Sequence, residues 1–300
     1  MKLLNYIKNG QYRLGIRTDS GVLDVESAAR ELSGKDVPKT IHEVIERGAS
    51  ATDVLQSLAE RATAVGDPIN SSWLNEEDIQ LGPCVTNPGK IICVGLNYRK
   101  HAEETNSPVP EFPILFNKFG NALAGHKDDI VLPNVSQKVD YEAELVIVIG
   151  KKAKNVSKDD ALDYVFGYCN VNDLSARDLQ LRTSQWLLGK TCDGFSPLGP
   201  YLVTADEVGN PNDLSIKAIV NGEVRQNSNT NDMIFRCDEI VSYISRHFTL
   251  LPGDLILTGT PEGVVMGYPP EKQAYLKDGD VVTIEIEKLG SLTNRLVAEK

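Results

Sequence analysis

The chain has 300 residues, of which 41% are hydrophobic and 24% charged, a composition typical of a folded globular protein. Its net charge of −11 makes the surface repel nucleic acid and anionic lipid. We therefore expect neither a nucleic acid nor a membrane as a partner.

No targeting or anchoring segment is visible in the sequence. Met1–Tyr6 has neither a long apolar stretch nor a small-residue cleavage site, and no apolar run reaches the roughly 20 residues that span a bilayer. The five cysteines are scattered and lack Cys-x-x-Cys spacing, which is typical of reduced thiols and gives no zinc signal. We therefore expect a cytoplasmic protein.

The first part of the chain predicts a small α+β domain. Turn signals at Asn9–Gly10 and Asp19–Gly21 separate short apolar strands, and helical periodicity follows to about residue 64. Residues 65–88 are rich in glycine, proline, serine and asparagine, which is typical of a linker. We predict a small N-terminal domain over residues 1–80 and a larger domain over residues 81–300.

The larger domain is predicted to consist mainly of strands. Apolar runs indicate strands at residues 90–95, 114–118, 141–150, 168–171, 254–259 and 281–286. Val220-Asn221-Gly222-Glu223 predicts a hairpin. Strands with this irregular spacing favour a rolled β-sheet structure over a βαβ repeat.

Three helices are also predicted in this domain. Ser157 and Asp160 form a capping box for a helix that ends near Gly167. Ser175 with Asp178 caps a second helix, and a third covers residues 236–247. The glycine motifs of dinucleotide and P-loop sites are absent, so nothing supports such a site.

Two glutamates interrupt the apolar run Tyr141–Gly150. Side chains alternate along a strand, so Glu142 and Glu144 point the same way. Because two buried carboxylates repel each other, a hard metal ion between them is expected. Asp173, at the end of the next strand, would complete a three-carboxylate site. The competing interpretations are an exposed strand edge for the glutamates and a helix-start residue for Asp173.

Glu104 lies three positions after His101, which places the two side chains on one face of a helix. A carboxylate beside an imidazole raises its basicity and fixes its tautomer, as a general base requires. A solvated face in a charged run is the alternative. Three prolines in residues 106–113 suggest a lid or hinge.

Lys118 and Lys190 are candidates for neutralising a substrate carboxylate. Lys190 lies near glycines in an uncharged stretch, and Lys118 ends an apolar strand, although most lysines are only surface charges. The turn Thr258–Pro261 could hold an anion through hydroxyl and backbone N–H groups.

These motifs together resemble the fumarylacetoacetate hydrolase superfamily over about residues 90–298. The resemblance rests on five segments: Gly95–His101, Asp140–Glu144, Asn172–Gln180, Gly189–Lys190 and Leu257–Val264. It implies a mixed α/β, mainly β structure, with a β-sandwich roll as the C-terminal domain behind a small α+β N-terminal domain. It also implies a homodimer.

The resemblance further implies roles for nine residues. The positions that match metal ligands, for Mg²⁺ or Mn²⁺, are Glu142, Glu144 and Asp173. Those that match catalytic residues are His101, Glu104 and Lys190. Those that match substrate-binding positions are Arg177, Gln180 and Thr260. To these three we add Lys118, on its position at the end of an apolar strand, as a further candidate for substrate binding. The segments after Lys190 and after Pro261 depart from the family pattern and could reshape the pocket.

Such a site allows three reactions on a small anionic 2-oxo acid. An ion that binds the carboxylate and keto oxygens stabilises an enolate, which forms by C–C hydrolysis, by loss of CO2, or by movement of a proton. We predict first a hydrolase of 2,4-diketo acids of the fumarylacetoacetate or acylpyruvate type. Oxaloacetate decarboxylase and 2-oxo acid tautomerase or isomerase are the alternatives, and a non-catalytic metal-binding scaffold is a further one.

Overall fold

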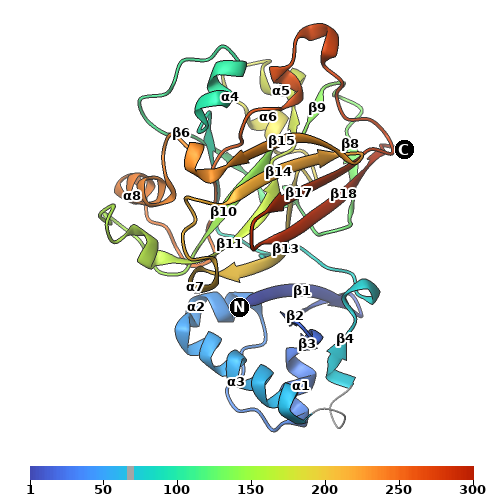
Figure 1. Cartoon of the computed structure of the whole chain (residues 1–300), viewed down its shortest axis with the longest axis vertical. Coiled ribbons are helices and arrows are strands. Elements are labelled where there is room, and N and C mark those ends of the chain that lie inside the picture. The colour runs from blue at the N-terminus through green and yellow to red at the C-terminus, as the bar shows by residue number, and fades with distance from the viewer. Residues whose placement is uncertain (66–70) are drawn as a thin grey trace.

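The computed structural model describes residues 1–65 and 71–300. Figure 1 shows a small lobe, formed by the N-terminal part of the chain, below a larger lobe that contains the other strands. The elements of the small lobe are β1 (Lys2–Lys8), β2 (Gln11–Thr18), β3 (Gly21–Asp24), α1 (Val25–Glu31), α2 (Ile41–Arg47), α3 (Ala49–Val65) and β4 (Trp73–Leu74). In the described part of the chain, no helix is long and apolar enough to cross a membrane.

Two sheets organise the molecule. The larger has the order β4-β3-β2-β1-β13-β11-β10-β16-β5-β6, with β7 beside β13. Its strands beyond the small lobe are β5 (Ile91–Gly95), β6 (Ile114–Lys118), β7 (Leu123–Ala124), β10 (Ala143–Ile149), β11 (Val165–Asn172), β13 (Ser196–Thr204) and β16 (Leu255–Leu257). The second sheet contains β15 (Glu223–Asn229), β14 (Ser215–Val220), β17 (Val281–Ile286), β18 (Gly290–Ala298) and β8 (Asp129–Leu132). β9 (Val139–Asp140) and β12 (Ser175–Ala176) form a separate short pair.

The second sheet packs over β10, β11 and β13 as one layer of a sandwich, as Figure 1 shows. The short helices α4 (Arg99–Glu104), α5 (Arg177–Gln180) and α6 (Leu187–Lys190) gather at the end of the larger lobe away from the small lobe. α7 (Ala205–Val208) lies at the opposite end, beside the small lobe, and α8 (Cys237–His247) lies at the flank. The mixed, mainly β architecture predicted from the sequence is confirmed.

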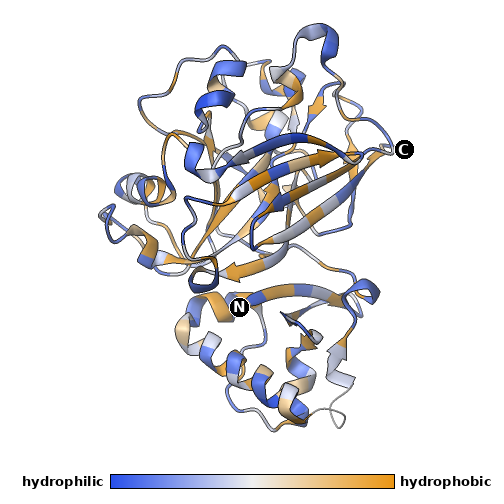
Figure 2. Ribbon diagram, viewed as in Figure 1, coloured by the Kyte–Doolittle hydropathy of each residue, from blue (hydrophilic) through white to orange (hydrophobic). Residues whose placement is uncertain are grey.

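β10 is buried on both faces, which explains its continuous apolar run. Leu145, Ile147 and Ile149 belong to the core between the two sheets. Val146 and Val148 belong to a second core, on the other face. Figure 2 shows the corresponding concentration of hydrophobic residues in the central strands.

The small lobe is joined to the larger one by sheet and by core. β1 pairs with β13, with Lys2 opposite Val203, so one sheet crosses both lobes. Residues of α2 and α3 lie in the same buried cluster as Val146 and Val148. The division at residue 80 stays a prediction.

The predicted linker over residues 65–88 is wrong for the part that the structure describes; residues 66–70 lie outside the described residues. β4 pairs with β3, and the amide of Ile7 donates to the carbonyl of Gln80 at 2.8 Å. Turn-forming residues predominate in the segment, but backbone pairing holds it against the lobe.

One helix prediction is also wrong, and one predicted cap is misplaced. Ser157 and Asp160 do bond each other, yet only a 3₁₀ turn, Ala161–Tyr164, follows before β11 begins. Buried Val165 and Phe166 favour the strand. The second predicted helix is present as a short helix over Arg177–Gln180, but Ser175 lies in β12 and does not cap it. Strands near residues 91, 114, 143, 168, 255 and 281, the hairpin at Asn221–Gly222 and the helix near 237 are confirmed.

Candidate active site

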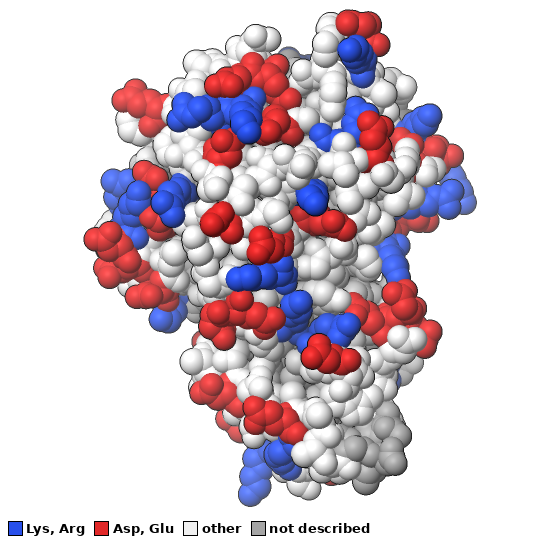
Figure 3. Space-filling model, in the orientation of Figure 1, with Lys and Arg blue, Asp and Glu red and all other residues white. Residues whose placement is uncertain are grey.

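A cavity of about 220 Å³ lies where α4, α5 and α6 approach the ends of β5, β6 and β10. Its lining includes His101, Glu142, Glu144, Lys190 and Thr260. A larger, open cleft of about 710 Å³ lies elsewhere, between α2, α3 and the start of β11. On the face drawn in Figure 3, basic and acidic side chains intermix. A charge that attracts an anion is therefore expected inside the small cavity, where Arg177 and Lys190 contribute to the lining.

Three carboxylates meet beside this cavity. Ligand atoms of Glu142, Glu144 and Asp173 all lie within 4.8 Å of one another, and each residue is at most 4% exposed. β10 carries Glu144, and Glu142 directly precedes that strand. The amide of Asp173, just after β11, donates to the carbonyl of Glu142 at 2.9 Å. Pairing of β10 with β11 therefore brings the three together.

Buried cations lie against these carboxylates. Lys190 Nζ is 2.6 Å from Glu142 and 2.7 Å from Asp173. Arg177 is 2.7 Å from Glu142, and Lys118 bonds Asp173. With Asp140, which pairs with Arg177 at 2.9 Å, four buried carboxylates face three buried cations. The cluster therefore has an excess of negative charge.

The excess is concentrated at Glu144. Burial, together with the charges of Asp173 and Glu142, raises the pKa of Glu144 well above its usual range. Burial also acts on Glu142, but Lys190 and Arg177 outweigh it and lower the pKa of Glu142 to about 2. Burial tends to discharge Lys190, yet Asp173 and Glu142 raise its pKa, so it stays protonated.

The donor set fits a hard divalent cation. Three oxygen donors converge, and Mg²⁺ and Mn²⁺ prefer oxygen ligands. A cation there would also offset the charge that is left uncompensated at Glu144. These observations support the predicted metal site.

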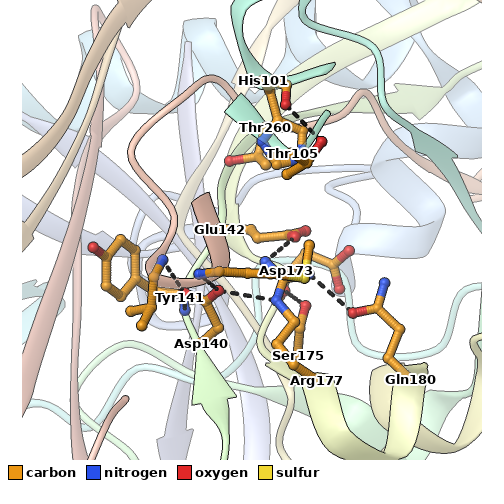
Figure 4. Close-up of polar contacts among 12 residues, drawn as sticks. His101, Thr105, Asp140, Tyr141, Glu142, Asp173, Ser175, Arg177, Gln180 and Thr260 are labelled. Carbon is orange, nitrogen blue, oxygen red and sulfur yellow. Dashed lines mark hydrogen bonds and ion pairs between the residues drawn. The ribbon is translucent and has the colours of Figure 1, made fainter. Parts of the chain in front are cut away.

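His101 and Glu104 form the predicted pair. His101 Nδ1 and Glu104 Oε1 are 2.8 Å apart, and Glu104 Oε2 accepts the amide of Gly263 at 2.9 Å. His101 is 4% exposed and lines the cavity. In Figure 4, His101 and Thr260 are drawn at one end of the polar group, and Asp140 and Arg177 at the other. Glu142 is drawn between these two ends, and His101, Glu142 and Glu144 all line the same cavity.

Arg177, Gln180 and Thr260 also line the cavity, whereas Lys118 is not among its lining residues. Gln180 accepts a hydrogen bond from Arg177 at 2.9 Å. Lys118 donates to the carbonyl of Phe195 at 2.7 Å and has no exposed side-chain surface. This placement favours a role for Lys118 in holding Asp173 over direct contact with substrate.

Two residues of the site were missed by sequence reasoning. Asp140 accepts from Arg177 and from the amides of Val265 and Met266, at 2.8 and 3.0 Å. Asn97 fixes the turn before α4 by donating to two backbone carbonyls, of Phe235 and Thr258. Both lie in the segments that carry the family resemblance, next to apolar strands, and that position was the signal that could have found them.

Lys190 depends on close packing of α6 against α5. A Cβ on Gly189 would lie 2.4 Å from the Gln180 amide nitrogen and 2.6 Å from the Ala176 carbonyl oxygen. We expect Gly189→Ala to displace α6, to cost about 1–3 kcal/mol of stability and to weaken activity. Thermal unfolding and kinetics check this. Gly120→Ala, where no atom lies within 4 Å, is the control. An unchanged Gly189→Ala enzyme would contradict the packing argument.

The site and fold match known proteins. The profile "Fumarylacetoacetate (FAA) hydrolase C-terminal" matches residues 90–297. The oxaloacetate tautomerase fahd2, mitochondrial, of Xenopus laevis is 44% identical over 95% of this chain and 86% of its own. Similar solved structures that cover 100% of both chains include these two. Fumarylacetoacetate hydrolase from Exiguobacterium antarcticum has a TM-score of 0.82 at 33% identity. Maleylpyruvate hydrolase from Sphingobium sp. SYK-6, in complex with manganese(II) and pyruvate, has 0.77 at 29%.

The predicted cytoplasmic location is wrong by this comparison. The Xenopus laevis relative is named as mitochondrial, as are relatives from Bos taurus and Homo sapiens. The prediction rested on composition, reduced cysteines and the lack of a visible targeting segment. Folded domains of several compartments share those features.

Proposed function

Because the chain belongs to the fumarylacetoacetate hydrolase family, we propose that it is a metal-dependent tautomerase of a small 2-oxo acid, with oxaloacetate as the candidate substrate. The superfamily contains isomerases and hydrolases. The name of the Xenopus laevis relative supports tautomerisation, which the sequence analysis ranked below hydrolysis.

The observation that carries the proposal is the small cavity in which an imidazole faces the carboxylate cluster. At about 220 Å³, the cavity is below the usual range for drug-sized ligands, which favours a short dicarboxylic acid. Tautomerisation needs a proton carrier at one carbon and stabilisation of charge at one oxygen. It requires no space for a second substrate or a long acyl group.

The chain's residues supply the proton transfer. In the keto-to-enol direction, His101 takes a proton from carbon 3, and solvent supplies a proton to the keto oxygen. In the reverse direction, the enol oxygen releases its proton to solvent, and protonated His101 returns one to carbon 3. The bond between His101 Nδ1 and Glu104 leaves Nε2 as the nitrogen for this exchange. Mg²⁺ or Mn²⁺ held by Glu142, Glu144 and Asp173 would supply Lewis acidity toward the substrate oxygens.

Other side chains hold and orient the anion. Arg177, Gln180 and Thr260 offer hydrogen-bonding groups along the cavity. Phe116 and Trp186 form an apolar wall, with their rings edge-on at 5.3 Å, and Lys190 lies 5.2 Å from the Phe116 ring. This wall excludes water and strengthens charge interactions inside the cavity.

C–C hydrolysis is the second candidate. The same imidazole could activate a water, and maleylpyruvate hydrolase is among the structural relatives. The outer fragment of a diketo acid, however, needs more room than oxaloacetate. Decarboxylation of oxaloacetate is a further alternative, and the release of CO2 distinguishes it from tautomerisation in the assay below.

The proposal is tested on oxaloacetate and acylpyruvates with Mn²⁺ or Mg²⁺. We expect rapid loss of enol absorbance from freshly dissolved enol-oxaloacetate, little release of CO2 and slow or no cleavage of acylpyruvates. The uncatalysed rate and chelator-treated enzyme provide the baseline. Rapid acylpyruvate cleavage without tautomerisation would establish the hydrolase instead, and stoichiometric CO2 release the decarboxylase.

A further inference from the structure

A buried glutamine from the second sheet reaches the cavity loop. Gln226 lies in β15 and has no exposed surface. Its Oε1 accepts the amide of Ala143 at 2.9 Å. Its Nε2 donates to Thr260 Oγ1 at 2.9 Å and to the carbonyl of Pro261 at 2.8 Å. One side chain therefore connects the start of β10 with the loop that carries Thr260.

The orientation of this amide is fixed by chemistry. A backbone N–H can only donate, so the oxygen of Gln226 must face Ala143. A backbone carbonyl can only accept, so the nitrogen must face Pro261. In the reverse orientation, the NH2 group of Gln226 would face the N–H of Ala143, and its oxygen would face the carbonyl oxygen of Pro261, so neither hydrogen bond could form. Nε2 is therefore the atom that meets Thr260.

This orientation determines the polarity of the Thr260 hydroxyl. The hydroxyl oxygen accepts from Gln226, so its own proton is available to another acceptor. Within residues 1–65 and 71–300, this hydroxyl donates no hydrogen bond, although Thr260 is only 3% exposed and lines the cavity. A buried donor without a partner is unfavourable, so a ligand that brings an acceptor is favoured.

We infer that Gln226 is a positioning residue that presents the Thr260 hydroxyl as a hydrogen-bond donor to a carboxylate oxygen of the substrate. The inference deepens the proposed function and rests on it for the substrate class. A carboxylate accepts without donating, and hydrogen bonds to charged acceptors are stronger than neutral ones. Binding should therefore favour a dicarboxylic acid over its monoamide.

Oxalate with saturating Mn²⁺ is the probe, because its binding by calorimetry does not depend on which reaction the enzyme catalyses. Thr260→Val, which keeps shape but removes the hydroxyl, should weaken oxalate binding about 10–100-fold. Thr260→Ser should stay within about threefold of wild type. Gln226→Met should weaken binding too, because the hydroxyl is then free to turn away.

The double variant separates positioning from a purely structural role. If Gln226 acts through Thr260, Gln226→Met should change oxalate binding by less than about threefold in the Thr260→Val background. An equal loss in both backgrounds would falsify the inference. The control is Asn294→Leu, which removes another buried amide, on β18, and should lower thermal stability without changing oxalate binding.

A second substitution guards against misfolding. Gln226→Glu keeps an acceptor for Ala143 but presents a second oxygen to Thr260, so the hydroxyl donates to the new carboxylate and not to the ligand. That oxygen also opposes the Pro261 carbonyl, so we expect lower thermal stability. The folded fraction, measured by thermal unfolding, should bind oxalate more weakly and show a raised KM. Wild-type affinity in this variant would overturn the inference. If the variants bind oxalate as expected but the wild-type enzyme does not tautomerise oxaloacetate, the result would count against the proposed reaction and not against the role of Gln226.

Discussion

Replacing Glu144 by glutamine should abolish metal binding and turnover. The substitution keeps the shape but removes one of three charged oxygen donors. Loss of a ligand's hydrogen-bonding neighbour typically costs about 10–100-fold in affinity or activity, and loss of a ligand itself should cost more. Mn²⁺ titration calorimetry measures the binding, and the tautomerase assay measures the turnover. Glu142→Gln and Asp173→Asn should have the same effect.

Stability separates this result from misfolding. Glu144 is a buried carboxylate beside two others, so its neutral replacement should leave the metal-free protein at least as stable. Asp254→Asn is the matched control. Asp254, which directly precedes β16, is equally buried but pairs with Lys90. Removing its charge should therefore lower stability without affecting Mn²⁺ affinity. Exhaustive chelation should silence the wild type, and Mn²⁺ or Mg²⁺ should restore it. Full activity after chelation would exclude a metal-dependent reaction.

Replacing His101 by alanine should lower tautomerisation by roughly 10²–10⁴-fold, the usual contribution of a general acid–base group. Solvent deuterium exchange at carbon 3 should fall in parallel, because the same nitrogen moves that proton. Glu104→Gln should cost less, since the imidazole remains but is less well oriented. Glu103→Gln, an exposed carboxylate on the same helix, should be neutral.

The two measurements also distinguish the reactions. If His101 served only to activate water, His101→Ala would lose acylpyruvate cleavage while carbon-3 exchange continued. Wild-type exchange and tautomerisation in His101→Ala would remove the pair from the mechanism.

Local sequence patterns predicted the parts of the site that lie close together along the chain. The apolar run around Glu142 and Glu144 was sufficient for a buried strand, and the three-residue spacing of His101 and Glu104 placed them on one helical face. Asp173 was predicted as the end of a strand. Its contact with Glu142 depends on the pairing of β10 with β11.

Contacts between distant segments were beyond the sequence. Gln226 reaches Thr260 from the second sheet. Lys118, the last residue of β6, donates to Asp173, which is 55 residues away in the sequence. The hydrogen bond expected from the capping box at Ser157 does form, but the helix does not, because the buried side chains that follow favour strand β11. In the Ser157 segment, tertiary burial outweighed the local signal.

The pairing of β1 with β13 has a consequence for biosynthesis. β1 leaves the ribosome early with β2 on one side. On its other side, Asn5 and Ile7 bond Gly82 and Gln80, but the end at Lys2–Leu3 pairs with β13, which is encoded roughly 200 residues later. At about 5–20 residues per second, that end of the edge waits on the order of 10–40 s with its backbone groups unpaired. Unpaired edges recruit other strands, so nascent chains are most vulnerable to aggregation during this interval. Slower translation before residue 196 should therefore lower the soluble yield, whereas slower translation after residue 204 should not.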